Sequence, residues 1–343
     1  MNDNTDRERS FDKINYLLRP KKQIERKILI DIFNKIDDIS DYHYIGLGSV
    51  FFYDFILFHK YLNIKRMTSL EKDKKSVKRC KFNRPYDFIK FHSMSTTEFI
   101  DNHSFNEKSI IWFDYDTMLW DLRCKGSVRD ISESAILQDV RIITKKVNER
   151  TFFILTVDVT PPTKVPEWKS FIETFGAYLG DFPMIRDRDI PSQKEDLRAK
   201  YNQMIQAIIL NSIDDNQRFQ RLKFTKLFSF YCKDSSPMYT LGGVYDDPEA
   251  LNGLISTIKR DNGFVNLNEG EITNIDVPIL TYKEKCYLDH RVEELTNAIG
   301  NNAENVSLTD VVNGLEFEII PPHRLRTYLD FYRYYPQYYE GII

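Results

Sequence analysis

The sequence has only four cysteines, and their arrangement excludes the common cysteine-based sites. Cys80, Cys124, Cys232 and Cys286 are far apart, no CxxC pair occurs, and the six histidines form no HxxxH motif. Zinc knuckles and thiol redox motifs need closely spaced ligands, so neither is expected. We expect these thiols to be reduced residues of the core or the surface.

Long apolar runs and an excess of positive charge are also missing. No stretch of about 18 apolar residues occurs, so we expect no transmembrane helix and no membrane partner. The 48 Lys and Arg residues against 51 Asp and Glu give a net charge of −3, which excludes a globally basic nucleic-acid coat. The polar start, MNDNTDRERS, lacks the apolar core of a signal peptide, so we expect a cytoplasmic location.

Helix and strand patterns alternate over most of the 343 residues. Near-continuous apolar strands between helices are typical of a parallel sheet that is covered on both faces. Residues 233–237 are turn formers between the last two strands and predict an antiparallel hairpin. The predicted fold is therefore α/β and Rossmann-like, with a seven-stranded, mostly parallel sheet, a terminal hairpin and a mainly helical C-terminal appendage. Strands are expected at 42–45, 66–70, 87–91, 110–113, 152–157, 223–232 and 238–245, and helices at 20–37, 51–62, 72–81, 136–147, 168–178 and 190–213.

Composition and pattern divide the chain into three parts. Residues 1–40 are expected to form an N-terminal helical cap, and residues 41–245 the main domain with a helical insertion at about 183–222. Residues 246–343 are rich in Asn and acidic residues, hold a helix at 282–299 and end in an aromatic helix. We interpret them as an α-rich appendage.

A glycine loop followed by an acidic residue is the most informative pattern. Gly46 and Gly48 end the first strand, Ser49 is expected to cap the next helix, and Glu71 ends the following strand. A glycine turn lets a ligand approach the backbone, and an acidic residue at this distance suits the hydroxyls of a ribose. The pattern predicts a nucleoside cofactor across the strand ends. Phe51 occupies the third position of a dinucleotide GxGxxG loop, and no P-loop motif occurs.

Seven short motifs are spread over nearly the whole chain. They are NYLLRPKKQIERK (15–27), YIGLGS (44–49), SLEKD (69–73), FNRP (82–85), WFDYD (112–116), VPILTYKE (277–284) and FYRYYP (331–336). With the cofactor pattern and the terminal hairpin, the sequence resembles the class I S-adenosylmethionine-dependent methyltransferases over roughly residues 20–245. Within that superfamily these motifs make it similar, nearly from end to end, to bacterial O-methyltransferases without an assigned substrate.

The resemblance implies S-adenosyl-L-methionine as cofactor and assigns it a set of contacts. Gly46, Gly48 and Ser49 would line the methionine part, Glu71 would hold the ribose, and Arg19 would reach the carboxylate. The adenine edge would be read by three residues after the third strand: His92, Ser93 and Met94.

The acceptor side of the reaction follows from what is missing after the fourth strand. WFDYD has neither the PC pair of cytosine-C5 methylation nor the (D/N/S)PP(Y/F/W) tetrad of base amino-methylation. We therefore expect an oxygen acceptor, or an unconventional nitrogen, with Asp114 or Asp116 as general base. A Mg²⁺ site on Asp114, Asp116 and Asp158 is the weaker alternative, because lone carboxylates at strand ends are commonly solvated.

Two further segments leave partners and alternative functions open. Lys60–Arg84 holds ten basic residues against Glu71 and Asp73, which suits nucleic acid but is more often a solvated helix face. Tyr328–Tyr339 holds seven aromatics that could pack within the chain or onto a protein partner. The alternatives to an O-methyltransferase are therefore a methyltransferase-fold regulatory subunit, for instance in a bacterial defence assembly, and an RNA- or DNA-modifying methyltransferase that uses Lys60–Arg84.

Overall fold

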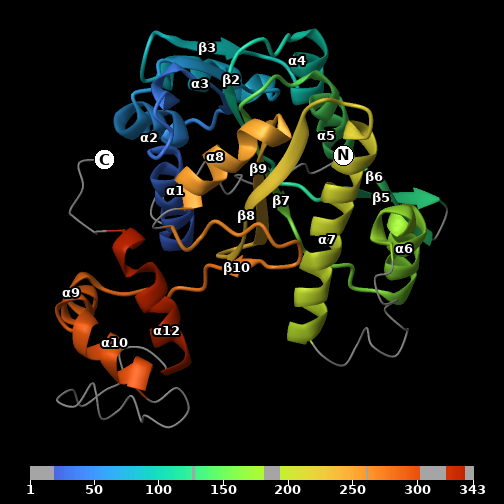
Figure 1. Cartoon of the computed structure of the whole chain (residues 1–343). Coiled ribbons are helices and arrows are strands. Elements are labelled where there is room, and N and C mark those ends of the chain that lie inside the picture. Colours follow the sequence, from blue (N-terminus) through green and yellow to red (C-terminus); the bar gives the residue numbers. More distant parts are fainter. Residues whose placement is uncertain (1–18, 126–127, 181–193, 260–261, 302–321, 337–343) are drawn as a thin grey trace.

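A computed structural model describes residues 19–125, 128–180, 194–259, 262–301 and 322–336 (Figure 1). Its main sheet has eight strands. In spatial order these are β10 (Thr273–Asn274), β8 (Lys223–Lys233), β9 (Pro237–Asp246), β7 (Thr151–Asp158), β4 (Ser109–Asp114), β1 (His43–Leu47), β2 (Arg66–Leu70) and β3 (Ile89–His92).

All seven predicted strands are present, and the predicted α/β fold is confirmed. Only β9 runs antiparallel to its neighbours, β7 and β8, while the other pairs are parallel. The two-residue strand β10 adds an eighth member. The chain leaves β1 towards β2 on one side and reaches β4 on the other, so the strand order reverses between β1 and β4. Crevices at such a reversal, outside the carboxyl ends of the strands, are where ligands bind.

One hairpin was not predicted. Strands β5 (Trp120–Lys125) and β6 (Val128–Glu133) pair with each other in a separate two-stranded sheet. The sequence of β5, WDLRCK, alternates apolar and charged residues, so the local pattern for this strand was present and was missed. The hairpin follows β4, packs against a helix on one side of the sheet and precedes the helix that leads to β7.

Helices cover both faces of the sheet (Figure 1). On one face lie α1 (Pro20–Phe33), α2 (Tyr53–Leu62), α3 (Lys74–Asn83) and α8 (Pro248–Lys259). The other face carries α4 (Thr96–Asn102), α5 (Ala135–Lys146), α6 (Val165–Leu179) and α7 (Lys194–Gln217). Each central strand sends alternate side chains into the two cores: Trp112 of β4 belongs to the first and Phe113 to the second. Two-sided burial explains why these strands read as continuous apolar runs.

The predicted helical insertion contains α7, which packs against α5 and α6 as part of the second layer. Trp120 donates a hydrogen bond from Nε1 to Tyr201 Oη of α7 at 2.6 Å. The preceding residues 181–193 lie outside the described part of the chain. In the described ranges, no helix combines the length and apolar character needed to cross a bilayer.

The C-terminal part packs against the first face through its aromatic segment. After β10 come α9 (Tyr282–His290), α10 (Val292–Asn301), α12 (Pro322–Phe331) and the 3-10 turn η4 (Tyr332–Tyr334). Phe331 stacks on Phe264, and Tyr334 donates a hydrogen bond to Asp31 of α1. Tyr328 and Tyr335 are buried. These four aromatic side chains therefore pack within the chain and join its C-terminal part to the rest. Tyr338 and Tyr339 lie outside the described residues.

Candidate active site

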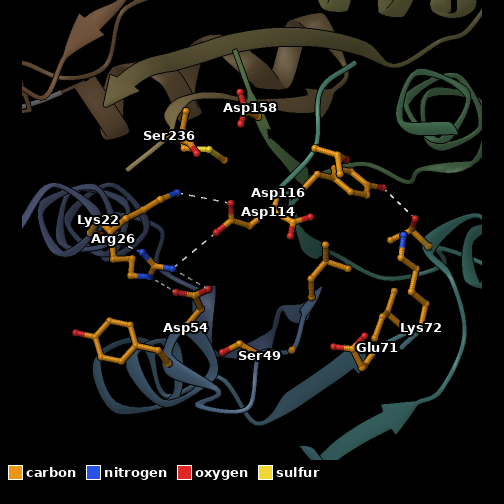
Figure 2. Close-up of a pocket in the computed structure, with 18 of the residues that line it drawn as sticks. Lys22, Arg26, Ser49, Asp54, Glu71, Lys72, Asp114, Asp116, Asp158 and Ser236 are labelled. Carbon is orange, nitrogen blue, oxygen red and sulfur yellow. Dashed lines mark hydrogen bonds and ion pairs between the residues drawn. The ribbon is translucent and has the colours of Figure 1, made fainter. Parts of the chain in front are cut away.

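A pocket of about 280 Å³ lies at the carboxyl ends of the parallel strands (Figure 2). Its walls come from the start of α1, the ends of β1, β2, β4 and β7, the loop before α4 and the turn between β8 and β9. The pocket therefore sits at the reversal of strand order, and Lys22 and Arg26 face Glu71 and Lys72 across it (Figure 2). Of the predicted site residues, it is lined by Arg19, Gly48, Ser49, Glu71, Met94, Asp114, Asp116 and Asp158.

The glycine loop forms one wall, but it does not lead directly into the helix. Ser49 was predicted to cap α2, and this is wrong: α2 begins at Tyr53, and Ser49 Oγ accepts a hydrogen bond from Phe51 N at 3.2 Å. Phe52 is in the left-handed region, with φ of 49°, and its buried ring anchors the turn. This extra turn separates Ser49 from the helix and leaves it on the pocket wall.

Glycine stands at positions 46 and 48 for different structural reasons. A Cβ on Gly48 would lie 2.0 Å from Ser69 Oγ, so the buried Ser69 side chain would have to move to admit any larger residue. Gly46 lies within β1 and does not line the pocket. A Cβ there would lie 2.5 Å from the Tyr44 hydroxyl, so packing of the buried Tyr44 ring explains this glycine.

The end of β2 presents Glu71 to the pocket beside Lys72. Glu71 Oε1 accepts a hydrogen bond from Asp73 N at 2.7 Å, and Asp73 caps α3 by accepting from Lys75 N at 3.1 Å. This turn fixes the direction of the Glu71 carboxylate. The position therefore suits a hydrogen-bond acceptor for a ligand hydroxyl, as expected for a ribose.

After β3, the pocket is lined by Met94, Ser95 and Thr96 rather than by His92 and Ser93. Ser95 caps α4 in a reciprocal arrangement with Glu98, whose backbone N donates to Ser95 Oγ at 3.2 Å. The sequence Ser95-Thr96-Thr97-Glu98 is the S/T-x-x-E signature of such a cap. That signature could have identified the start of this helix and so the two additional wall residues.

A buried ionic network on α1 was not predicted from the sequence. Lys22, Glu25 and Arg26 are all nearly inaccessible to solvent, with exposures of 5%, 0% and 2%. Lys22 Nζ lies 3.4 Å from Glu25 Oε2 and 3.6 Å from Asp114 Oδ1. Arg26 Nη2 lies 3.9 Å from Asp114 Oδ2 (Figure 2). The network therefore joins α1 to the end of β4 at the pocket.

Arg26 also binds the second helix and the core. Its guanidinium pairs with the Asp54 carboxylate at the start of α2 and lies 5.5 Å from the ring centres of Tyr53 and Trp112. A planar guanidinium suits both a carboxylate and an aromatic face, which an ammonium does less well. Buried cations of this kind need several partners, because an uncompensated charge in the interior is costly.

Glu25 is fixed by a chain of buried hydroxyl groups that crosses the sheet. Trp112 Nε1 donates to Thr156 Oγ1 at 3.0 Å, and Thr156 and Thr240 hydroxyls lie 2.9 Å apart. Thr240 in turn donates to Glu25 Oε1. Side chains from β4, β7 and β9 thus hold Glu25, and Glu25 holds Lys22. The sequence signal was a charged triplet, Lys22, Glu25 and Arg26, within an otherwise apolar helical stripe.

Three aspartates at the ends of β4 and β7 line the pocket and differ in their surroundings. Asp114 faces Lys22 and Arg26, Asp116 is exposed, and Asp158 Oδ1 accepts a hydrogen bond from Thr160 N at 2.7 Å. Within the described residues, no three acidic, His or Cys side chains gather closely enough to hold a metal ion. The weaker magnesium interpretation therefore finds no preformed group of ligands.

The turn between β8 and β9 closes the pocket beside Asp158 with Cys232, Asp234, Ser236 and Met238. Burial raises the pKa of Asp234 above its usual value, although Lys21, Arg19 and Lys22 act to lower it. Burial also raises the pKa of the Cys232 thiol to about 12. Cys232 is therefore a neutral thiol at physiological pH and not a nucleophile.

A second buried carboxylate fixes the wall opposite α1. Asp139 of α5 accepts hydrogen bonds from the Thr96 and Thr97 hydroxyls, both at 2.5 Å, and from the Tyr115 hydroxyl at 2.7 Å. Burial, together with Asp139, raises the pKa of Tyr115 well above its usual value. Tyr115 therefore remains protonated and donates to Asp139, which ties the residue between Asp114 and Asp116 to the start of α4.

Residues 14–343 match a family described as "Putative O-methyltransferase". The chain belongs to this O-methyltransferase family. The match extends beyond the sheet and includes the C-terminal appendage, so that appendage is part of the family's sequence. No curated protein matches the sequence.

Solved methyltransferase structures match this O-methyltransferase family member at low identity. One is Trm1 from Pyrococcus horikoshii with S-adenosyl-L-methionine. It is 12% identical with a TM-score of 0.43, and the match covers 67% of this chain and 56% of that chain. Another is S-adenosylmethionine-dependent methyltransferase SibL in its apo form: 10% identity, TM-score 0.35, 66% of this chain and 55% of that chain. A third is a "putative caffeoyl-CoA O-methyltransferase" from Staphylococcus aureus: 11% identity, TM-score 0.34, 68% of this chain and 92% of that chain. The matches thus span just over half of the first two proteins.

Proposed function

We propose that this protein transfers a methyl group from S-adenosyl-L-methionine to an oxygen acceptor, with a nitrogen acceptor as the second choice. The pocket carries this proposal. It lies where the strand order reverses and combines a close-approach glycine loop, an acidic residue at the end of β2 and buried cations from α1. Membership of an O-methyltransferase family supports the same reaction class.

The pocket residues fit the parts of this cofactor. Gly48 and Ser49 would line its methionine part, and Glu71 would accept hydrogen bonds from the ribose hydroxyls. Met94 and Ser95 would lie along the adenine ring. Lys22, with Arg19 nearby, supplies the positive charge that a carboxylate requires in a partly buried site.

On the acceptor side, we assign different roles to the two candidate bases. When bound, S-adenosyl-L-methionine supplies a methyl group that is already activated by attachment to a positively charged sulfur. Asp114 faces Lys22 and Arg26, so we assign it to charge balance and to positioning of α1 against the pocket. Asp116 is exposed at the pocket edge, and we assign it to removal of the proton from the acceptor hydroxyl.

Calorimetric titration with S-adenosylmethionine and S-adenosylhomocysteine tests the cofactor assignment. We expect micromolar binding to the wild type and at least tenfold weaker binding to Glu71→Ala. Asp73→Ala is the matched control: it shortens the neighbouring acidic residue, which caps α3 and does not line the pocket. Absence of binding to the folded wild type would instead support a regulatory subunit that retains the fold.

Transfer of labelled methyl groups to a cell extract tests the assigned base. We expect Asp116→Asn to lower transfer by roughly 10²–10⁴-fold, the range typical of a lost general base. Binding of S-adenosylhomocysteine should be unchanged, because this product does not require the base. Equal transfer by the wild type and the variant would contradict the assignment of Asp116.

A further inference from the structure

One segment of this protein has a strong excess of positive charge. Residues 60–84 contain ten basic residues and two acidic ones, a net charge of +8, while the whole chain has −3. The rest of the chain therefore carries −11. We call the basic residues of this segment the α3 patch; they are Lys60, Lys65, Arg66, Lys72, Lys74, Lys75, Lys78, Arg79, Lys81 and Arg84.

The charges of the α3 patch face solvent. All of its members are exposed except Arg84, which is half-buried. Arg66 pairs with Glu107 at 2.7 Å, and Arg84 lies 3.7 Å from Asp87. The two acidic residues of the segment, Glu71 and Asp73, accept backbone hydrogen bonds in the turn that begins α3.

Helix α3 differs from an ordinary solvated helix in the sign of its charges. It contains five basic residues and no acidic one in ten residues, KKSVKRCKFN. Lys74 and Lys78, and likewise Lys75 and Arg79, are four residues apart, a spacing at which like charges destabilise a helix. A solvated helix face normally alternates charges of both signs. Binding of an anionic partner along the helix would lower this repulsion between like charges.

An exposed aromatic ring stands among these cations. Phe82, at the end of α3, is 89% exposed, and Tyr61, next to Lys60, is 52% exposed. Lys60 Nζ lies 5.3 Å from the Tyr61 ring centre. Cations that follow a phosphate backbone, interleaved with rings on which bases stack, are the means by which proteins bind single-stranded nucleic acid.

The α3 patch adjoins the pocket at the start of α3. Lys72, just before the helix, lines the pocket. At the other end, Asn83 donates a hydrogen bond from Nδ2 to the carbonyl of Val50, the residue after Ser49, at 3.0 Å. A polymer that lies along α3 therefore reaches the pocket at Lys72.

We propose that the α3 patch binds single-stranded nucleic acid and that the methyl acceptor belongs to that strand. The second part rests on the function proposed above, whereas binding to the patch does not. Phosphates would contact the lysines of α3, and an unpaired base would stack on Phe82. RNA offers a ribose hydroxyl as oxygen acceptor and DNA does not, so the two strands are compared directly.

Fluorescence anisotropy with labelled 20-nucleotide single strands, RNA and DNA, tests binding without any cofactor. We expect log Kd to rise with log salt with a slope of about 3, which corresponds to four or five neutralised phosphates. The triple variant Lys74→Gln, Lys78→Gln, Lys81→Gln should bind at least tenfold more weakly and reduce the slope by about 2. Its matched control is Lys200→Gln, Lys259→Gln, Lys283→Gln, three exposed lysines on α7, α8 and α9, which should bind as the wild type does.

Phe82→Ala tests stacking separately from charge. We expect the variant to bind single strands roughly fivefold or more weakly than the wild type does, with an unchanged salt slope. We also expect the wild type to bind a duplex more weakly than a single strand, because paired bases cannot stack on Phe82. Phe219→Ala is the control, because Phe219 is equally exposed at 93% but lies outside the patch. Its affinity should equal that of the wild type.

Several results would overturn the inference. They are the absence of salt-dependent binding to either strand, equal losses in the two triple variants, and binding of anionic lipid vesicles through the same lysines without binding of nucleic acid. Calorimetry with S-adenosylhomocysteine on the same samples separates this failure from failure of the cofactor assignment. Loss of strand binding with intact cofactor binding would leave the proposed methyl transfer standing.

Discussion

Helix α1 has four cations in 14 residues and α3 has five in ten, but the structure surrounds these cations differently. In α1, Lys21 pairs with Asp276, Lys22 with Glu25 and Asp114, and Arg26 with Asp54. The lysines of α3 instead extend into solvent without an acidic residue on their helix. A cation within an apolar stripe is buried and needs acidic partners inside the protein, even where, like Lys22, it lines the pocket and can also meet a ligand carboxylate. A cation on a polar helix can be balanced from outside, by a ligand.

Arg26→Met should break the comparison most severely. The substitution removes the partner of Asp54 and Asp114, and loss of one member of a buried ionic network costs about 3–5 kcal/mol of unfolding free energy. Urea denaturation of the wild type and the variant measures this loss. Arg26→Lys is the control: it keeps the charge but not the planar fork, so its loss should be smaller. A loss below about 1 kcal/mol for the methionine variant would show that the α1 network is not essential for stability.

Acidification tests a buried ionisable group at the other end of β1. Burial lowers the pKa of His43 to about 4, and this effect outweighs the nearby Glu107. The unfolded chain, with a pKa near 6.5, therefore binds the proton first, and stability should fall by about 3 kcal/mol as the pH drops from 6.5 to 4. Urea midpoints across this range measure the effect. His43→Gln should flatten the curve, and an equally steep curve in that variant would assign the effect to other groups.

Gly48→Ala tests the glycine loop between β1 and α2, which lines the pocket. The added Cβ would meet Ser69 Oγ at 2.0 Å, so we expect a loss of about 1–3 kcal/mol in thermal or urea unfolding. Ser69→Ala in the same chain should recover part of it, because it removes the colliding oxygen. Gly176→Ala is the control: a Cβ in this α6 position meets nothing within 4 Å, and a gain of up to about 1 kcal/mol is expected. Equal effects at both glycines would rule out the close approach as the cause.

Lys78→Met should change the unfolding free energy least of these variants, which makes the contrast between α3 and α1 direct. Lys78 is exposed and surrounded by like charges, so its removal should change the unfolding free energy by no more than about 0.5 kcal/mol. Urea unfolding beside Arg26→Met gives the direct contrast. A loss of 2 kcal/mol or more would mean that α3 is balanced from within the chain after all.

The sheet could be predicted from the sequence because burial on both faces leaves a strong local signal. Every central strand is a short apolar run, and the strand ends of β1 and β2 carry Gly48 and Glu71. The hairpin β5–β6 was not predicted, although β5 alternates apolar and charged residues; its partner β6, VRDISE, lacks this alternation. The start of α2 was placed too early, because a buried Phe52 in a left-handed conformation has no local sequence signature.

The ionic network that joins α1 to the pocket could not be predicted, because it depends on residues that are far apart in the chain. Glu25 contacts Thr240, and Lys22 contacts Asp114, across separations that no local pattern records. The pocket residues after β3 also differ from the predicted ones: Met94 and Ser95 line the pocket, and His92 does not. The path of the chain after the strand determines this, and no local pattern records it. The residue types in the sequence indicated a cofactor site. Only the packing of α1 on the sheet shows that Lys22 and Glu25 belong to it.

The central claim is that buried α1 cations bind the carboxylate of the cofactor, and one titration tests it most directly. S-adenosylhomocysteine and its analogue without the carboxylate are each titrated calorimetrically into the wild type and Lys22→Met. We predict that the wild type prefers the carboxylated ligand by about 10–100-fold, as for a hydrogen bond to a charged group, and that Lys22→Met loses this preference. Equal affinity of the wild type for both ligands would contradict the claim.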